Sequence, residues 1–337
     1  MTAMTPRERV LTTIRHVQPD RVPHHFSYTS PVRRKLEAYF GTTDLDRVLE
    51  NHIAKYKPRC DDFLVEVGDG LWRDEFGVVW NREGDADVGA VVNCVLENRS
   101  LDVYSFPDPL LPCRYAKLPA FIEANRERFR VVNLGKSLFE RAWSMRGMEN
   151  ILIDMVEAPD WVEELLDAIT EFNLGNIAEV TRFDIDAVMF GDDWAAQRGL
   201  IFSPQLWRRL VKPRLARMYG AVRQAGKAVI IHSCGHVQEL LPELIALGVD
   251  VFNPFQPEVM DLGQIKRKFG AELPFYGGVS LQRVLPFGTP QEVRDEAGRL
   301  IDEIGRGGGY ILAPSHDMPA DIPVENIVAL LEAVRSQ

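Results

Sequence analysis

Histidine and cysteine side chains with the spacing of metal ligands follow one apolar segment of the chain. The run VIIHSCGHV at residues 229–237 contains His232 and Cys234, which are two residues apart. Residues i and i+2 of a β-strand point to the same side, so both side chains can face one point. Thiolate and imidazole are ligands that Zn²⁺ prefers, and a catalytic zinc needs three protein ligands and one open position. A buried cysteine beside a hydrogen-bonded histidine is the alternative interpretation.

Further candidates for chemistry follow other apolar runs. His316 ends the last of these runs, so we predict it as the third zinc ligand and as a candidate catalytic residue. Asp192 and Asp193 are adjacent carboxylates at the end of another run. The inward-facing one, assigned as Asp193, could accept a proton, and a loop-fixing role is the alternative. Glu66 is a second candidate for orienting the substrate or accepting its proton.

Eight short apolar runs alternate with amphipathic segments along the chain. They are rich in Val, Ile and Phe, as expected of parallel strands buried on both faces. They lie at residues 22–28, 62–67, 130–135, 186–193, 228–235, 249–255, 273–279 and 309–316. This alternation predicts a single α/β domain over residues 1–337, a (β/α)₈ TIM barrel, with a doubly wound sheet as the alternative. Active sites of such barrels lie at the C-terminal strand ends, where the candidate residues are expected to converge.

Two local patterns refine this prediction. Ser203 followed by Pro204 is typical of a helix N-cap and first helical position. Residues 68–118 do not follow the strand–helix alternation. Their segments EFGVVWNREG and GAVVNCVLEN predict a β-hairpin inserted after strand two. Loops of this kind often carry function, and a purely stabilising flap is the alternative.

Composition and charge exclude several classes of protein. The chain has 337 residues, 46% of them apolar, and a net charge of −10. An acidic protein is a poor non-specific binder of nucleic acid or anionic membranes. Four cysteines without framework spacing predict reduced thiols, and the charged N-terminus lacks the apolar core of a signal peptide. We therefore expect a cytoplasmic enzyme that acts on a small molecule.

Several long segments resemble the uroporphyrinogen decarboxylase superfamily. They are TPRERVLTTIRHVQPDRVP, FGDDWAAQRGLIFSPQLWRRLVKPRLARMY, HSCGHVQELLPELIALGVDVFNP and GTPQEVRDEAGRLIDEIGRGGGYILAPSHDMPADIPVENIVALLEAV. The resemblance covers essentially the whole chain and implies a (β/α)₈ barrel with a deep cleft. One branch of this superfamily decarboxylates uroporphyrinogen without a cofactor. Another transfers methyl groups from methyl-corrinoids to a thiol, with zinc holding the thiolate.

The residues of this chain are closer to the methyltransferase branch. The arginine-rich segment that grips carboxylates in the decarboxylases is missing from VPHHFSYTSPVRRKLEAYFG, where Arg33 and Arg34 come later. His232 and Cys234 match the His-x-Cys of the methyltransferases, and His316 stands where they have a further cysteine. The resemblance thus implies a zinc site with one fewer thiolate.

The resemblance also implies a reaction and its partners. It implies a zinc-dependent methyltransferase that acts between a corrinoid on a partner protein, or a methoxyl donor, and a thiol or related acceptor. A homodimer is compatible with it. A porphyrinogen-type decarboxylase is the main alternative, and a non-catalytic corrinoid- or metal-binding accessory protein is a third.

Overall fold

A curved parallel sheet of seven strands forms the centre of the computed structural model, which describes residues 3–83 and 89–337. In spatial order, its strands are β1 (Ile53–Tyr56), β6 (Phe129–Lys136), β7 (Ala187–Gly191), β10 (Ala228–His232), β11 (Val251–Phe255), β12 (Phe275–Val279) and β13 (Tyr310–Pro314). All neighbouring pairs are parallel. The predicted α/β class is confirmed, and the sheet is that of a TIM-barrel-like fold.

The first predicted strand, residues 22–28, lies between the two edges of this sheet. The backbone N–H of Leu312 in β13 donates to the carbonyl of Pro23 at 2.9 Å, and that of His25 donates to the Leu312 carbonyl at 3.1 Å. On the other side, the N–H of His52 donates to the His24 carbonyl at 3.0 Å. This segment forms isolated bridges at His24 and Tyr28 rather than a full strand, so its predicted length is wrong.

Alternate residues of the strands fill the interior of the sheet. One buried apolar cluster contains Ile53, Phe129, Val131, Ala187, Met189, Ile230, Val251, Tyr276, Ile311 and Ala313. Val10 of α1 (Pro6–Ile14) belongs to the same cluster, so α1 covers the N-terminal end of the strands. In this architecture ligands bind at the opposite, C-terminal end of the strands.

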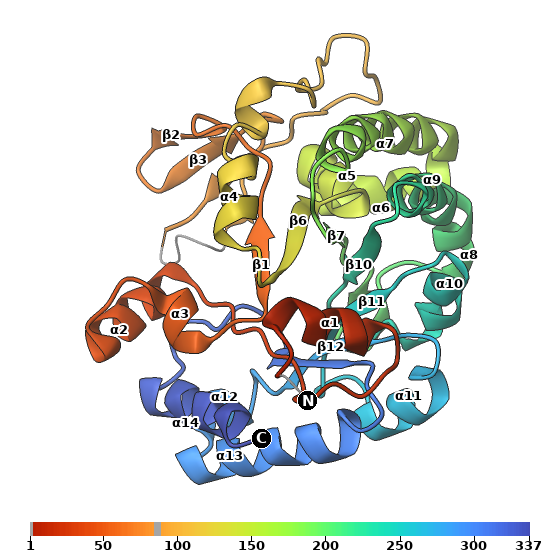
Figure 1. Cartoon of the computed structure of the whole chain (residues 1–337). Helices are drawn as coiled ribbons and strands as arrows, with labels where there is room; N and C mark the ends of the chain where they lie inside the picture. The colour runs from red at the N-terminus through yellow and green to blue at the C-terminus, as the bar shows by residue number, and fades with distance from the viewer. Residues whose placement is uncertain (1–2, 84–88) are drawn as a thin grey trace.

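Helices lie around the outside of the sheet, running broadly clockwise in Figure 1 from α5 at the top right to α14 at the lower left, with α12 beside α14. The longer helices are α2 (Ser30–Phe40), α5 (Phe139–Arg146), α6 (Met148–Glu157), α7 (Pro159–Val180), α9 (Lys212–Gln224), α11 (Leu262–Phe269), α13 (Pro290–Arg299) and α14 (Val324–Arg335). Shorter ones are α3 (Leu45–Leu49), α4 (Leu118–Ala124), α8 (Pro204–Leu206), α10 (Leu241–Ala246) and α12 (Val284–Phe287). Single tighter or wider turns are η1 (Pro112–Arg114), η2 (Trp207–Val211), η3 (Gln238–Leu240) and η4 (Leu300–Ile304).

Capping residues set where several helices begin. The Ser203 hydroxyl accepts the N–H of Leu206 at 3.2 Å, which confirms the predicted cap of α8. Thr5 and Thr289 begin α1 and α13 with capping boxes, in which a glutamate three residues later returns the contact. Such a reciprocal pair satisfies amide groups that the first helical turn leaves without partners.

The inserted region differs from its prediction in extent and form. Residues 62–67, predicted as barrel strand two, overlap β2 (Leu64–Gly68) of a separate antiparallel sheet, so that prediction is wrong. The sheet continues through β3 (Leu71–Asp74), β4 (Val79–Asn81) and β5 (Ala90–Val91), set apart from the parallel sheet in Figure 1. The predicted simple hairpin is thus replaced by four strands between β1 and β6, and residues 84–88 within it lie outside the described residues.

Two cysteines of this region are joined to each other. Cys60 and Cys113 form a disulfide with their Cα atoms 5.1 Å apart, although 53 positions separate them in the sequence. The prediction of four reduced thiols is therefore wrong for this pair and holds for Cys94 and Cys234. In the part of the chain that the structure describes, every helix is too short or too polar to cross a bilayer.

Candidate metal centre

A cavity of about 220 Å³ lies at the C-terminal ends of the parallel strands. All seven strands of the parallel sheet, and several of the turns that follow them, contribute residues to its wall. Its polar lining consists of Ser27, Lys55, Asn133, Lys136, Glu140, Asp193, His232, Asn253, Tyr276, His316 and Asp317. Strand alternation explains the placement, because His232 follows the interior residue Ile230 by two positions on β10.

The three predicted zinc ligands lie together, and two of them, His232 and His316, line this cavity. One donor atom from each of His232, Cys234 and His316 falls within 4.8 Å of the other two. The Cys234 Sγ is 3.4 Å from Nε2 of His232, and the two imidazole rings have centroids 5.3 Å apart. The fold thus brings His232 and Cys234, on and after β10, next to His316, which follows β13.

Hydrogen bonds outside the trio orient the His232 ring. Nδ1 of His232 lies 2.6 Å from Oδ1 of Asn253, whose amide nitrogen donates to the carbonyl of Tyr276 at 2.9 Å. The Asn253 oxygen therefore accepts a hydrogen bond, which assigns the ring proton to Nδ1. The lone pair of Nε2 is then available to bind a metal. Burial lowers the pKa of His232, so the ring is held in the neutral form that metals bind.

The turn after β10 holds Cys234 at a fixed position. The backbone N–H of Cys234 donates to Oδ1 of Asp193 at 2.7 Å, and that of Gly235 donates to Gln256 at 3.2 Å. Gly235 has φ +86°, and a Cβ there would lie 2.5 Å from the carbonyl oxygen of Ala195. Glycine is therefore required at this position for both backbone conformation and space.

The chemistry of the donor set fits a divalent cation. Burial raises the pKa of the Cys234 thiol, and the neighbouring carboxylates of Asp193 and Glu140 raise it further. A bound cation supplies the positive charge that a thiolate needs in such surroundings. Two imidazoles and one thiolate are a borderline-soft set of three ligands, which suits zinc with an open position.

The adjacent carboxylates of the DD pair differ in role. Asp192 is fully buried and accepts the N–H of Glu140 at 2.7 Å and the indole N–H of Trp194 at 2.6 Å. Burial raises its pKa to about 7. Asp193 instead lines the cavity and contacts the Cys234 backbone. Asp192 therefore fixes the loop, and Asp193 is the carboxylate placed to meet a ligand.

Four charged residues of the cavity, namely Lys55, Lys136, Glu140 and Asp317, were not found from the sequence. Lys55 is on β1, and burial lowers its pKa to about 8. Lys136 ends β6 with its Nζ 3.3 Å from the ring centroid of Trp80 in the inserted sheet, and burial lowers its pKa to about 8. Burial and the charges of Asp193 and Asp192 raise the pKa of Glu140 to about 8. Lys136 could have been noticed as a charge ending an apolar run, whereas β1 was not recognised as a strand.

Other sequence candidates lie elsewhere. Glu66 is exposed on β2 of the antiparallel sheet and does not line the cavity, because its segment is not part of the barrel. His24 is buried, with Nε2 2.9 Å from the Leu49 carbonyl, and His25 Nδ1 lies 2.6 Å from the Tyr276 hydroxyl. Their contacts are structural, and His236 is likewise outside the ligand trio.

Comparison with known proteins assigns the chain to a family. A model described as Uroporphyrinogen decarboxylase (URO-D) matches residues 133–337. The chain belongs to the uroporphyrinogen decarboxylase family. It is similar to uroporphyrinogen decarboxylases from Coxiella burnetii, at 23% identity over 54% of this chain and 49% of that one, and from Methylococcus capsulatus, at 25% over 57% and 53%. The matched region thus spans about half the length of these curated relatives.

Solved structures share the fold of this uroporphyrinogen decarboxylase family member over almost its whole length. A methyltransferase from Methanosarcina mazei aligns with a TM-score of 0.77 and 19% identity over 99% of both chains. A putative vitamin-B12 independent methionine synthase from Listeria monocytogenes aligns with a TM-score of 0.51 and 12% identity over 95% of this chain and 97% of that one. At these identities the likeness concerns the fold.

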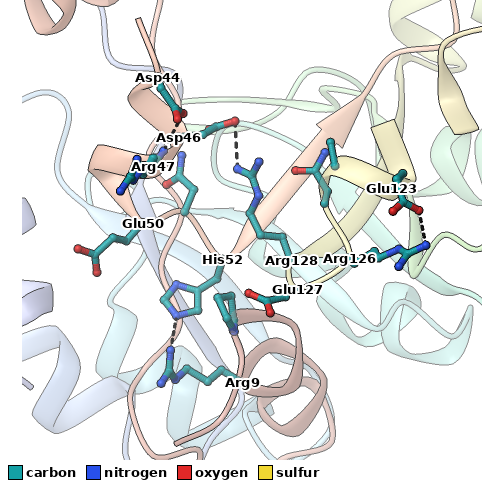
Figure 2. Close-up of a pocket in the computed structure, with 14 residues that line it drawn as sticks. Arg9, Asp44, Asp46, Arg47, Glu50, His52, Glu123, Arg126, Glu127 and Arg128 are labelled. Atoms are coloured by element: carbon teal, nitrogen blue, oxygen red, sulfur yellow. Dashed lines mark hydrogen bonds and ion pairs between the residues drawn. The ribbon is translucent and has the colours of Figure 1, made fainter. Parts of the chain in front are cut away.

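A larger cavity of about 560 Å³ lies at the other end of this family member, between α1, α3 and α4. Figure 2 shows its charged side chains largely engaged with one another. Arg128 contacts the carboxylate of Asp46 at 3.0 Å, and Arg9 lies 3.3 Å from Nε2 of His52. The arginines of this cavity are balanced by aspartates and glutamates, and among the described residues the one converging set of potential metal ligands is that of His232, Cys234 and His316.

Proposed function

We propose that this chain is a zinc-dependent methyltransferase that delivers a methyl group to a thiol or a related acceptor. The observation that carries the proposal is the convergence of His232, Cys234 and His316 within 4.8 Å at the C-terminal strand ends. These three residues would hold zinc and leave a fourth position facing the cavity. Bound zinc lowers the pKa of a thiol substrate and presents it as a thiolate at neutral pH.

The surrounding residues have separate tasks in this proposal. Asn253 fixes the ring of His232, so Nε2 points toward the Cys234 sulfur, 3.4 Å away. Asp193 lines the same cavity, and we assign its carboxylate to receive the proton that the acceptor thiol loses. The narrow cavity of about 220 Å³ limits how much water can surround the reacting atoms.

The methyl donor is the second part of the proposal. We assign a corrinoid on a partner protein as the donor, with a methoxyl compound as the alternative. The shared fold with a Methanosarcina mazei methyltransferase supports a methyl-transfer reaction, and the His-x-Cys of β10 supports the same branch of the superfamily. The donor should reach the acceptor through the open C-terminal end, because α1 covers the other end.

A decarboxylase of porphyrin biosynthesis is the second candidate function. The match to the URO-D model and to curated uroporphyrinogen decarboxylases favours it, as do the ammonium groups of Lys55 and Lys136 in the cavity. The two candidates are separated by incubating the protein with uroporphyrinogen III. We expect no coproporphyrinogen, and turnover near ~1 s⁻¹, an ordinary enzyme rate, would favour the decarboxylase instead.

The methyltransferase proposal is tested with methylcobalamin and small thiols as substrates. We expect zinc-dependent methyl transfer by the wild type and its loss in Cys234→Ser, because the variant lacks the only thiolate of the set. Cys94→Ser is the matched control, since Cys94 is the other free cysteine and its thiol donates to backbone carbonyls of α5. A Cys234→Ser variant as active as Cys94→Ser would overturn the proposal.

A further inference from the structure

A second cavity of about 260 Å³ adjoins the candidate metal centre. Its wall shares Asn133, Gly135 and Lys136 with the metal-centre cavity, so the turn at the end of β6 borders both. The rest of its lining comes from Leu134 of β6, from the segment after β1, from the turn between β3 and β4, from η1, from α5 and from α7. A ligand with its reacting end at the metal centre could therefore extend along β6 into this second cavity.

The second cavity is strongly cationic in an otherwise acidic protein. Its lining contains one carboxylate, Glu75, and five cationic side chains, namely Lys57, Arg59, Arg114, Lys136 and Arg141. The whole chain, by contrast, carries a net charge of −10. A local excess of positive charge inside a concave wall attracts anions and concentrates the electric field there.

Part of this positive charge forms no close ion pair with a carboxylate among the described residues. Arg114 pairs with Glu75, and Arg141 donates to Asp74 at 2.8 Å. Lys57 and Arg59 are exposed, and within residues 3–83 and 89–337 no carboxylate oxygen lies within 4.0 Å of their charged nitrogens. The Nε of Arg141 is also buried without a hydrogen-bond partner in the described structure. A buried donor of this kind is costly unless a ligand satisfies it.

Covalent and hydrogen-bonded links hold the two cationic segments together. The disulfide between Cys60 and Cys113 joins the segment that carries Lys57 and Arg59 to η1, which carries Arg114. The hydroxyl of Tyr56 donates to the Arg114 carbonyl at 2.7 Å. The backbone positions of the two segments are therefore set before a ligand arrives, which reduces the entropic cost of binding.

We propose that the second cavity binds an anionic group of the substrate, a carboxylate, sulfonate or phosphate, with Lys57 and Arg59 as its specificity-determining contacts. The position of the reacting end at His232, Cys234 and His316 rests on the proposed function, whereas anion binding does not. Arginine forks suit the planar or tetrahedral oxygens of these anions. The methyl acceptor would thus carry its reactive group and its anionic group at two ends, with the turn at the end of β6 beside the part between them.

Binding of small oxyanions to the full-length protein tests this proposal. Inorganic phosphate, acetate and methanesulfonate are titrated separately by calorimetry at low ionic strength. We expect the wild type to bind one of them with a dissociation constant at or below about 1 mM, within the limit for so small a ligand. The tightest of the three identifies the class of anion. The double variant Lys57→Gln/Arg59→Gln should weaken that binding by about tenfold or more, the loss expected for charge-assisted contacts.

Two controls locate the anion. Arg47→Gln removes an exposed arginine from the cavity of Figure 2 and should leave binding unchanged. Cys234→Ser should lose zinc but retain anion binding, so failure of the metal centre and failure of the anion site are separate results. The proposal is overturned if the wild type binds none of the three anions, if the double variant binds as well as the wild type, or if Arg47→Gln is the variant that weakens binding.

Discussion

The two ends of the parallel sheet carry cavities of opposite character. The cavity at the N-terminal end, near α1, is about 560 Å³, and the one at the C-terminal strand ends is about 220 Å³. In the larger one, charges are matched within the protein, as in the contact between Arg128 and Asp46. In the smaller one, the donor atoms of His232, Cys234 and His316 face one another.

The larger cavity is therefore not the one whose side chains suit a reaction. Matched charges at an exposed surface contribute little to stability and leave little field for a ligand. At the smaller cavity, half-buried His232 and Cys234 converge with the more exposed His316, and Asn253 orients the His232 ring by a hydrogen bond. This arrangement suits a metal ion. The smaller cavity is therefore the better candidate for catalysis, and variants at the two ends should behave differently.

The largest expected effect is at the third ligand. We expect His316→Ala to weaken zinc binding by more than about 100-fold, beyond the effect of a partner outside the ligand set. His236→Ala is the matched control, because His236 also follows β10 but is not among the three donors. Competition with a zinc-binding dye gives both affinities, and equal values would remove His316 from the site.

A smaller loss is expected from the residue that orients His232. Asn253→Ala removes the acceptor at 2.6 Å from Nδ1 but none of the three donor atoms. We expect zinc affinity to fall by about 10- to 100-fold, as is typical for such partners. The same dye competition measures it. An affinity as low as that of His316→Ala would contradict the division between ligand and orienting residue.

At the N-terminal cavity, we instead expect His52 to make the free energy of unfolding depend on pH. Burial lowers the pKa of His52 to about 3 from 6.5, so protonation favours the unfolded chain. Stability is therefore complete above about pH 6.5 and falls as pH decreases toward 3, by up to about 1.4 kcal/mol per pH unit for one such group. Urea unfolding between pH 7 and 4 measures this slope. His52→Gln should reduce it, and an unchanged slope would assign the effect to other groups.

The smallest effect is expected at the exposed rim of the same cavity. Arg47→Gln should change the free energy of unfolding by less than about 0.5 kcal/mol, as for most surface substitutions. Zinc affinity and methyl transfer should also remain at wild-type values. Thermal unfolding and the assays above check this. A loss of activity in this variant would mean that the larger cavity takes part in the reaction.

Apolar runs predicted six of the seven strands of the parallel sheet, because strands buried on both faces leave a strong pattern. The pattern failed for β1, because its short sequence IAKY contains the charged residue Lys55. This side chain is buried in the folded protein, which the sequence does not indicate. It also took residues 62–67 for a barrel strand, although an antiparallel strand in an insertion can have equally apolar residues.

The site was predictable where spacing along one strand determines geometry. His232 and Cys234 are two residues apart on and after β10, so their common direction followed from the sequence. Glu140 lies on a helix after its strand, and the pairing of Cys60 with Cys113 spans 53 positions. Neither leaves a local signal, since both depend on how distant segments pack.

The central claim is that His232, Cys234 and His316 bind one zinc ion, and X-ray absorption at the zinc edge tests it most directly. After loading and removal of excess metal, we expect one zinc per chain, with one sulfur at about 2.3 Å and two nitrogens at about 2.0 Å. Cys234→Ser should lose the sulfur shell, while Cys94→Ser should keep it. Stoichiometry below about 0.1 zinc per chain, or a spectrum without sulfur in the wild type, would contradict the claim.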